Sequence, residues 1–131
     1  MVYIVLKIKK EGRKKFPEAV CAFLERYKAE NLLQELIDKG EDPEGVWVEP
    51  GFPHTMVKHP FYGFDCEAIS DNSLGDVVYP IWHIESRRDA CGIIHTVLKT
   101  EQDTELYKEN EWPLYKDGFK GLMVLNCKLV K

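Results

Sequence analysis

The sequence lacks several patterns that identify large classes of protein. No apolar run approaches the roughly 18–20 residues that a membrane-spanning helix needs. The apolar stretch at residues 2–8 runs into lysines instead of a signal-peptide cleavage site. There is also no glycine-rich nucleotide-binding motif, internal repeat or low-complexity tract. We therefore expect a cytoplasmic protein that enters no membrane and holds no cofactor.

Cysteine is present, but not in pairs. The chain has four cysteines, scattered singly, and none forms the C-x-x-C motif that holds zinc or performs thiol exchange. This scatter is typical of reduced, mostly buried thiols in a cytosolic protein. The four are Cys21, Cys66, Cys91 and Cys127.

The length and composition fit one globular domain. A chain of 131 residues is long enough to bury a single core. Its content of 44% hydrophobic and 31% charged residues is normal for a soluble globular protein. The predicted domain therefore spans residues 1–131.

Charge is unevenly distributed along the chain. Residues 1–15 hold six basic residues against one acidic residue, a balance of +5, so the remainder carries −9 within the net charge of −4. An acidic body argues against general binding of nucleic acid, which needs a basic face. The basic stretch is better explained as an edge strand and its turn, where lysines discourage pairing with other chains.

The order of patterned segments predicts an α+β fold. We expect a mainly antiparallel β-sheet of four to six strands, with N-terminal helices packed on one face and a short acidic helix before the last strand. Apolar alternation and turn residues delimit the strands. The predicted strands are Val2–Lys9, Val46–Glu49, Asp65–Ile69, the two strands within Val77–Lys99, and Leu122–Val130.

Two segments are predicted to be helical. From Pro17 to Lys39 apolar residues recur at helical spacing, but the stripe jumps half a turn near Asn31, so we expect a kink or two helices there. Residues 100–103 read Thr-Glu-Gln-Asp, which fits a capping-box start for the acidic helix.

The stretch Val77–Lys99 is the centre of this architecture. It reads as two strands around a charged turn, with apolar residues at even-numbered positions and the titratable groups at odd-numbered ones. If both apolar faces enter the core, even residues must oppose even residues. That register requires an odd number of loop residues or a bulge at the turn.

In this register the odd-numbered face is polar and carries two histidines. His83 lies opposite Ile93 and Ile81 opposite His95, so the histidines are diagonal neighbours about 7–8 Å apart at the backbone. A two-residue turn would place them on opposite faces. The predicted wet face consists of Tyr79, His83, Glu85, His95 and Lys99.

Paired histidines titrate near neutrality and can act as general acid and base on a phosphodiester. The candidate catalytic residues are His83, His95 and Glu85, and the cations that would neutralise phosphate are Arg87, Arg88 and Lys99. The H-x-T spacing of the two-histidine phosphoesterases is absent. No H-x-H or H-E-x-x-H motif is present either, so we expect no metal site.

Residues 50–64, PGFPHTMVKHPFYGF, form the least regular segment. Three prolines and two glycines exclude a long element, yet the segment carries four aromatic residues. It either packs on the core as a lid or presents a recognition surface, and we favour the lid because four exposed aromatics would promote aggregation. A lid over the wet face would let His54 or His59 complete a pocket. The ligand-binding candidates are Tyr79, Arg87, Arg88, Lys99, His54, His59, Phe61 and Tyr62.

Two classes of function stay open. The first is a small binding or regulatory protein, similar to an inhibitor, immunity protein or adaptor, that acts on a protein partner or small ligand or as a homodimer. The alternative is a hydrolase of phosphodiesters or nucleotides that uses His83 and His95. The sequence does not decide whether the protein is an enzyme.

Overall fold

The computed structural model describes residues 1–86, 91–115 and 121–131, and the side chains of all of these except 85, 86, 91 and 111–115. Neither described helix is long and apolar enough to cross a membrane. The elements are β1 (Val2–Glu11), β2 (Lys14–Phe23), α1 (Arg26–Asp38), the 3₁₀ turn η1 (Pro43–Gly45), β3 (Val46–Gly51), β4 (Pro53–Lys58), β5 (Phe64–Ala68), the 3₁₀ turn η2 (Asp71–Ser73), β6 (Val77–Ser86), β7 (Cys91–Leu98), α2 (Glu101–Tyr115), β8 (Gly121–Val124) and β9 (Cys127–Val130).

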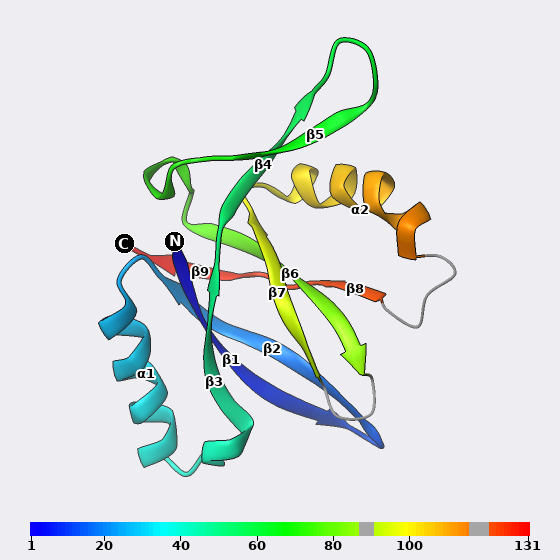
Figure 1. Ribbon diagram of the computed structural model, residues 1–131. Coiled ribbons are helices and arrows are strands. Elements are labelled where there is room, and N and C mark those ends of the chain that lie inside the picture. The colour runs from blue at the N-terminus through cyan, green and yellow to red at the C-terminus, as the bar shows by residue number, and fades with distance from the viewer. Residues whose placement is uncertain (87–90, 116–120) are drawn as a thin grey trace.

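The strands form one curled, mixed sheet. Its nine strands follow the order β3-β1-β2-β9-β6-β7-β4-β5, with β8 also paired to β6. The β2–β9 and β4–β7 pairs are parallel and the others are antiparallel. The sheet curls into a half-barrel with two helices (Figure 1). The prediction of an α+β fold with four to six antiparallel strands is therefore wrong.

Three errors explain the low strand count. The segment assigned to the first helix contains β2, the proline-rich segment contains β4, and the single predicted last strand is two strands, β8 and β9. The predicted strands Val2–Lys9, Val46–Glu49 and Asp65–Ile69 are confirmed as β1, β3 and β5, within one or two residues at each end.

The expected break at Asn31 is also wrong. Lys14–Phe23 is a strand and Arg26–Asp38 is one helix that passes through Asn31. The apolar stripe jumped because it joined a strand, whose residues pack into two different clusters, to a helix. Within α1 the apolar positions Ala29, Leu32 and Leu36 share one stripe and pack on the core.

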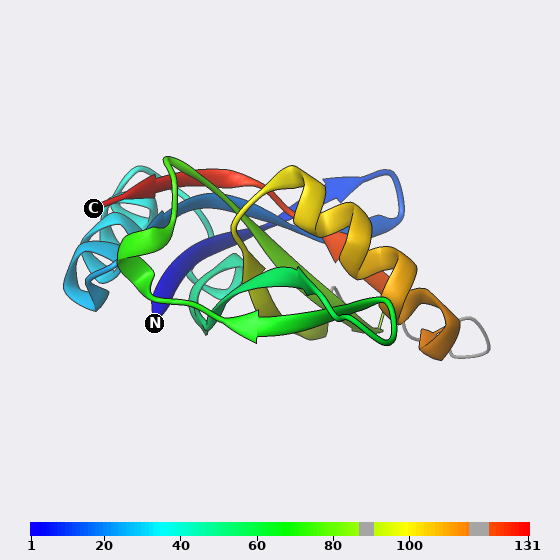
Figure 2. The same cartoon turned by 90° about the horizontal axis from the view of Figure 1, so that it is seen from above.

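Three apolar clusters hold the layers together. The main one fills the inside of the curl and joins β1, β6, β7 and β9 through residues such as Ile4, Trp82 and Val97. A second lies under α1, where Val5 and Phe23 meet Ala29. A third lies under α2, where Ile81 and Leu98 meet Tyr107. Seen from above, α1 and α2 lie at different parts of the sheet (Figure 2).

The start of α2 confirms the predicted capping box. The Thr100 hydroxyl accepts a hydrogen bond from the Asp103 backbone N–H at 3.1 Å, and the Asp103 carboxylate accepts one from the Thr100 N–H at 3.1 Å. The same carboxylate accepts bonds from the Thr55 hydroxyl and the Met56 N–H, each at 3.1 Å. Asp103 therefore joins the start of α2 to β4.

Candidate functional site

The structure brings the two central histidines together. His83 pairs with Ile93, as the predicted register requires, and the imidazole rings of His83 and His95 stack with centroids 4.1 Å apart and planes 10° apart. The register shifts between Ile81 and Trp82, so Ile81 lies opposite Thr96 instead of His95. His95 is thus the extra residue of a bulge, which bends the strand and resets its alternation.

The face that carries the histidines is only partly wet, contrary to prediction. Ile81 and Leu98 are fully buried on this side of the sheet and Tyr107 of α2 is 2% exposed above them. His95 remains exposed, and its ring lies 6.3 Å from that of Tyr107. The polar face expected from alternation is therefore a second core with the histidine pair at its margin.

The other residues expected on this face do not gather around the histidines. Tyr79 is half-buried and packs into the cluster under α2. Lys99 follows His95 by four residues, about 13 Å along an extended strand. The side chain of Glu85, and Arg87 and Arg88 as a whole, lie outside the described residues.

Stacking restricts the chemistry that the histidine pair can perform. The nitrogen lone pairs of an imidazole lie in the ring plane, so two parallel rings direct them side by side and not toward one metal ion. A centroid separation of 4.1 Å also leaves no room for a phosphate between the rings. Within the described residues no three His, Cys, Asp or Glu side chains are grouped to hold a metal.

His54 and His59 have contacts of their own. The Nδ1 atom of His54 lies 2.8 Å from the carbonyl oxygen of Phe52 and also contacts the Thr96 hydroxyl. His59 lies at the far end of the β4–β5 hairpin, where its ring stacks on Tyr62. Neither contact closes a pocket over the stacked histidines.

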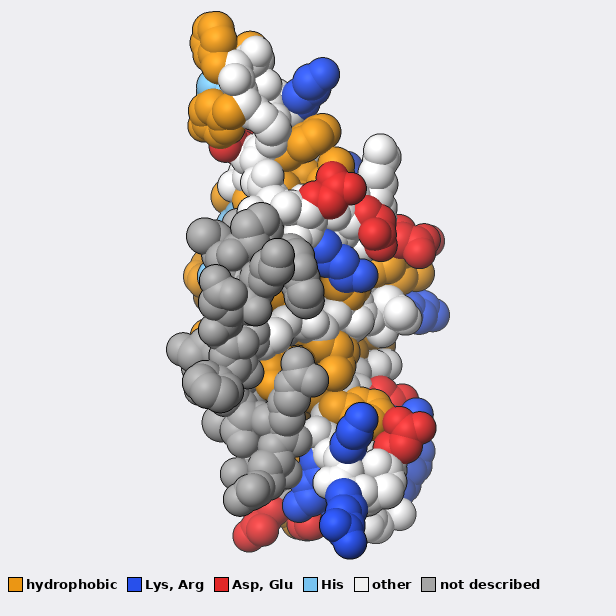
Figure 3. Space-filling model, turned by 90° about the vertical axis from the view of Figure 1, so that its right-hand side faces the viewer, with side chains coloured by type: hydrophobic (Ala, Val, Ile, Leu, Met, Phe, Trp, Pro, Cys, Tyr) orange, Lys and Arg blue, Asp and Glu red, His pale blue; other side chains and the backbone are white. Residues whose placement is uncertain are grey.

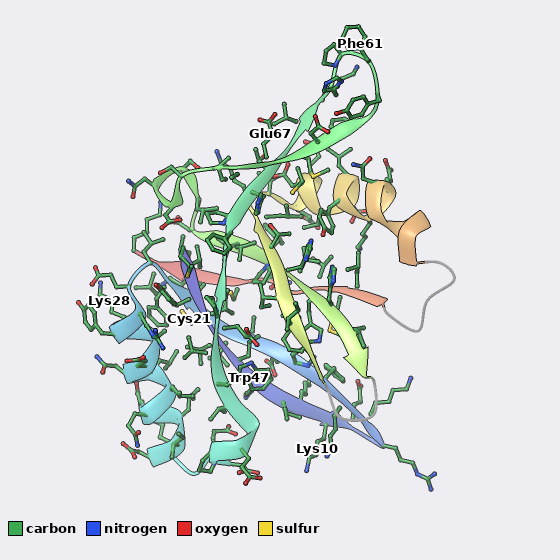
Figure 4. All side chains as sticks on the ribbon, in the orientation of Figure 1. Lys10, Cys21, Lys28, Trp47, Phe61 and Glu67 are labelled. Atoms are coloured by element: carbon green, nitrogen blue, oxygen red, sulfur yellow. The ribbon has the colours of Figure 1, made fainter. Side chains whose placement is uncertain are left out.

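The β4–β5 hairpin extends from the body of the protein as an arm (Figure 1). We call residues 59–63 at its end the aromatic tip. Phe61 is 89% exposed and Tyr62 is 59% exposed, and Phe61 stands at the outermost point of the arm (Figure 4). The prediction that residues 50–64 pack on the core as a lid is wrong for this tip, whose aromatic side chains are exposed.

Local contacts hold the aromatic tip in one shape. The rings of His59 and Tyr62 stack at 3.8 Å and the ring of Phe61 lies 5.8 Å from that of His59. The His59 N–H donates to the Gly63 carbonyl at 2.9 Å and the Phe61 N–H to Nδ1 of His59 at 3.2 Å. The Tyr62 hydroxyl donates to Asp65 at 3.3 Å, and this bond raises the pKa of Tyr62.

Hydrogen bonds with α2 fix the arm to the body at two places. Asp103 holds Thr55 and Met56 of β4, as described above, and the Asn110 side-chain amide of α2 donates to the Phe64 carbonyl at 2.6 Å. α2 therefore holds the arm from the middle of β4 to Phe64, the residue that follows the aromatic tip.

The cysteines whose side chains are described form no disulfide. Burial, together with neighbouring Cys21, raises the pKa of Cys127 to about 12, and burial raises the pKa of Cys21 as well. Neither is therefore a thiolate nucleophile at neutral pH. Cys66 is exposed, contrary to the expectation of mostly buried thiols, and the side chain of Cys91 is not described.

Glu49 gives a pH-dependent prediction. Burial raises its pKa, although a hydrogen bond from the Trp47 indole acts in the opposite direction. Because the pKa of Glu49 is higher in the folded state, the folded protein favours the protonated carboxyl. The stability that Glu49 contributes is therefore complete below its unfolded pKa and is lost as the pH rises through its folded pKa. We therefore expect Glu49→Gln to unfold at higher urea concentration than the wild type at pH 7, and the gain to vanish at about pH 3. The exposed control Glu44→Gln should show no such change, and an equal gain at both pH values would contradict the prediction.

Comparison with known proteins adds no relative. No protein-family model matches the sequence, and searches of curated proteins and of solved structures gave no match.

Proposed function

We propose that the protein is a small binding or regulatory protein whose aromatic tip docks into a pocket of a partner protein. The observation that carries this proposal is the 89% exposure of Phe61 at the end of an anchored arm. Clustered exposed aromatics are uncommon on a protein that acts alone, and they are the side chains that most often dominate interface energies.

The order of the tip favours binding. The stacked His59 and Tyr62 and the backbone hydrogen bonds of His59 and Phe61 fix the tip before any partner arrives. A preformed tip loses less conformational entropy on association than a flexible loop would. Phe61 is then the anchor, with Tyr62 beside it.

The test is affinity capture from the native host with matched variants. Wild-type protein, Phe61→Ala and Tyr27→Ala are immobilised equally, and bound proteins are quantified by mass spectrometry. Tyr27 of α1 is the control because it is 57% exposed, close to the 59% of Tyr62, and lies outside the arm.

We expect one partner to bind the wild type and Tyr27→Ala and to bind Phe61→Ala at least about 30-fold more weakly, as for a side chain worth about 2 kcal/mol at an interface. Equal thermal midpoints of the variants show that folding is unchanged. A partner that binds Phe61→Ala as tightly as the wild type would refute the proposal.

The alternative hypothesis, a hydrolase that uses His83 and His95, has less support than the binding protein. The stacked rings of His83 and His95 leave no space for a phosphate between them, and the cations expected to assist are either distant along the strand or outside the described residues. A screen of nucleotides and RNA for turnover, repeated with His83→Ala and His95→Ala, separates the two readings. Turnover that these substitutions abolish would favour the enzyme.

A further inference from the structure

One strand in the middle of the sheet has an open edge. β2 pairs with β1 along its whole length, but on its other side it pairs with β9 only at Ala22 and Phe23. Over residues 14–21 no described strand continues the sheet on that side. β8 instead pairs with β6, so β2 and β8 separate from one another beyond β9 (Figure 1).

A groove lies between β2 and β8. Its volume is about 380 Å³. It is lined by residues 16–19 of β2, by residues 123–126, which include the end of β8, and by Lys9 of β1. Phe16, Ala19 and Met123 give the lining an apolar part. We call this groove the strand slot.

The register shows which backbone groups of β2 face the slot. β1 and β2 are joined by the two residues Gly12 and Arg13, and the pair that closes a two-residue hairpin is a hydrogen-bonded pair. Bonded and non-bonded pairs then alternate, so the N–H and C=O groups of Lys15 and Ala19 point away from β1. Pro17 occupies the position between them, so it offers the slot its carbonyl oxygen but no N–H donor, and Ala19 supplies the donor within the slot.

β8 presents its backbone to the slot in the same way. The Leu125 N–H donates to the Pro80 carbonyl at 2.8 Å, so this pair is the bonded one. The adjacent pair, Val124 with Ile81, is then non-bonded, and the backbone groups of Val124 point away from β6. Both sides of the slot thus offer donors and acceptors of the kind that an added strand satisfies.

The charged side chains around the slot indicate which kind of partner segment would bind there. Lys9 lines the slot and its ammonium lies 5.9 Å from the centre of the Phe16 ring. The hairpin end beyond it carries four more exposed cations against the single exposed Glu11, and one acidic residue, Glu18, lines the slot itself. Two of these cations, Lys10 and Lys15, line a second groove beside Glu41, Asp42 and Glu44, so Arg13 and Lys14 remain to extend the positive charge of Lys9. The four cations are Lys10, Arg13, Lys14 and Lys15. Lys and Arg side chains lie at the lower end of the face in Figure 3, with some acidic side chains among them and far from the arm at the top.

We propose that the strand slot accepts an extended acidic segment of a partner protein as an additional β-strand between β2 and β8. Backbone hydrogen bonds on both sides would supply affinity, and the lysines would select Asp and Glu at alternate positions. This surface is separate from the aromatic tip, so the two proposals can fail independently.

The probe is a displayed library of random ten-residue peptides, panned against the immobilised full-length protein. We expect the enriched peptides to be rich in Asp and Glu and to alternate with apolar or β-branched residues. Their affinity should fall at least tenfold when alternate peptide nitrogens are methylated, because methylation removes the donors of an added strand and keeps the side chains.

Variants of the protein locate the binding site. Ala19→Pro removes a donor that faces the slot and should weaken binding at least tenfold, whereas Phe61→Ala on the arm should leave it unchanged. Lys9→Glu should weaken binding of acidic peptides severalfold, and less so in high salt. If Ala19→Pro does not fold, the methylated peptides still decide the question. Failure to enrich acidic alternating peptides, or equal binding of methylated and unmodified peptides, would overturn the proposal.

Discussion

Asp103→Ala is expected to lower the free energy of unfolding by about 3–5 kcal/mol, because this 5% exposed carboxylate accepts hydrogen bonds from three residues. Removing it leaves the buried Met56 N–H without its acceptor, a loss that alone costs about 1–3 kcal/mol. It also removes half of the capping box of α2, which costs roughly another 0.5–2 kcal/mol.

Urea unfolding measures this loss against a matched control. Glu101→Ala removes an exposed carboxylate from the same first turn of α2 and should change stability by less than about 0.5 kcal/mol. If Asp103→Ala stays within about 1 kcal/mol of the wild type, the carboxylate does not hold α2 to the arm as described.

Gly51→Ala should be the second strongly destabilising change. A Cβ atom at this position would lie 2.5 Å from Cγ2 of Val97 and 3.2 Å from methyl groups of Ile4 and Ile94. Gly51 is the point where β3 passes β7 and the sheet curls on itself, so these neighbours belong to the packed main core. Overpacking of this kind costs typically about 1–3 kcal/mol, and a stiff valine at 2.5 Å places the loss near the upper end.

Gly75→Ala is the control for this experiment, because a Cβ atom there meets nothing within 4 Å. Thermal or urea unfolding should separate the two alanine variants clearly. The double variant Gly51→Ala, Val97→Ala should also lose less than the two single changes summed, since the smaller side chain relieves the overlap. Strict additivity would show that Gly51 and Val97 are not in contact.

Local alternation predicted part of the fold well. The strands β1, β3 and β5 were recognisable because apolar residues recur or turn residues delimit them, and the capping box at Thr100 needs only four consecutive residues. These features depend on neighbours in sequence, which a single sequence displays directly.

The rest of the fold could not be predicted because it depends on packing between segments far apart in the sequence. β2 was assigned to a helix because both of its faces are covered, one by α1 and one by the main core, so it shows no clean alternation. β4 was missed because the three prolines of residues 50–64 suggested a loop, although only Pro53 lies in the strand and it stands at the first residue, a position where proline is tolerated. The parallel pairs β2–β9 and β4–β7 join segments far apart in sequence and leave no local signal.

In the candidate site, too, local features could be predicted from the sequence and tertiary contacts could not. That His83 and His95 share a face followed from alternation within one hairpin, and their stacked rings confirm it. That α2 covers much of this face did not follow, because Tyr107 reaches Ile81 only through the tertiary fold. The sequence also placed Phe61 and Tyr62 among the binding candidates, but only the projection of the arm distinguishes an exposed tip from a lid.

The most direct test of the account is site-specific photo-cross-linking in cells of the native host. A benzophenone amino acid is placed at position 61, 62 or 27 of the full chain, and cross-linked proteins are identified after irradiation. We expect positions 61 and 62 to give the same light-dependent cross-link to one protein, and position 27 to give none. No cross-link at position 61, or an equal cross-link at position 27, would contradict the claim that the aromatic tip is the docking site.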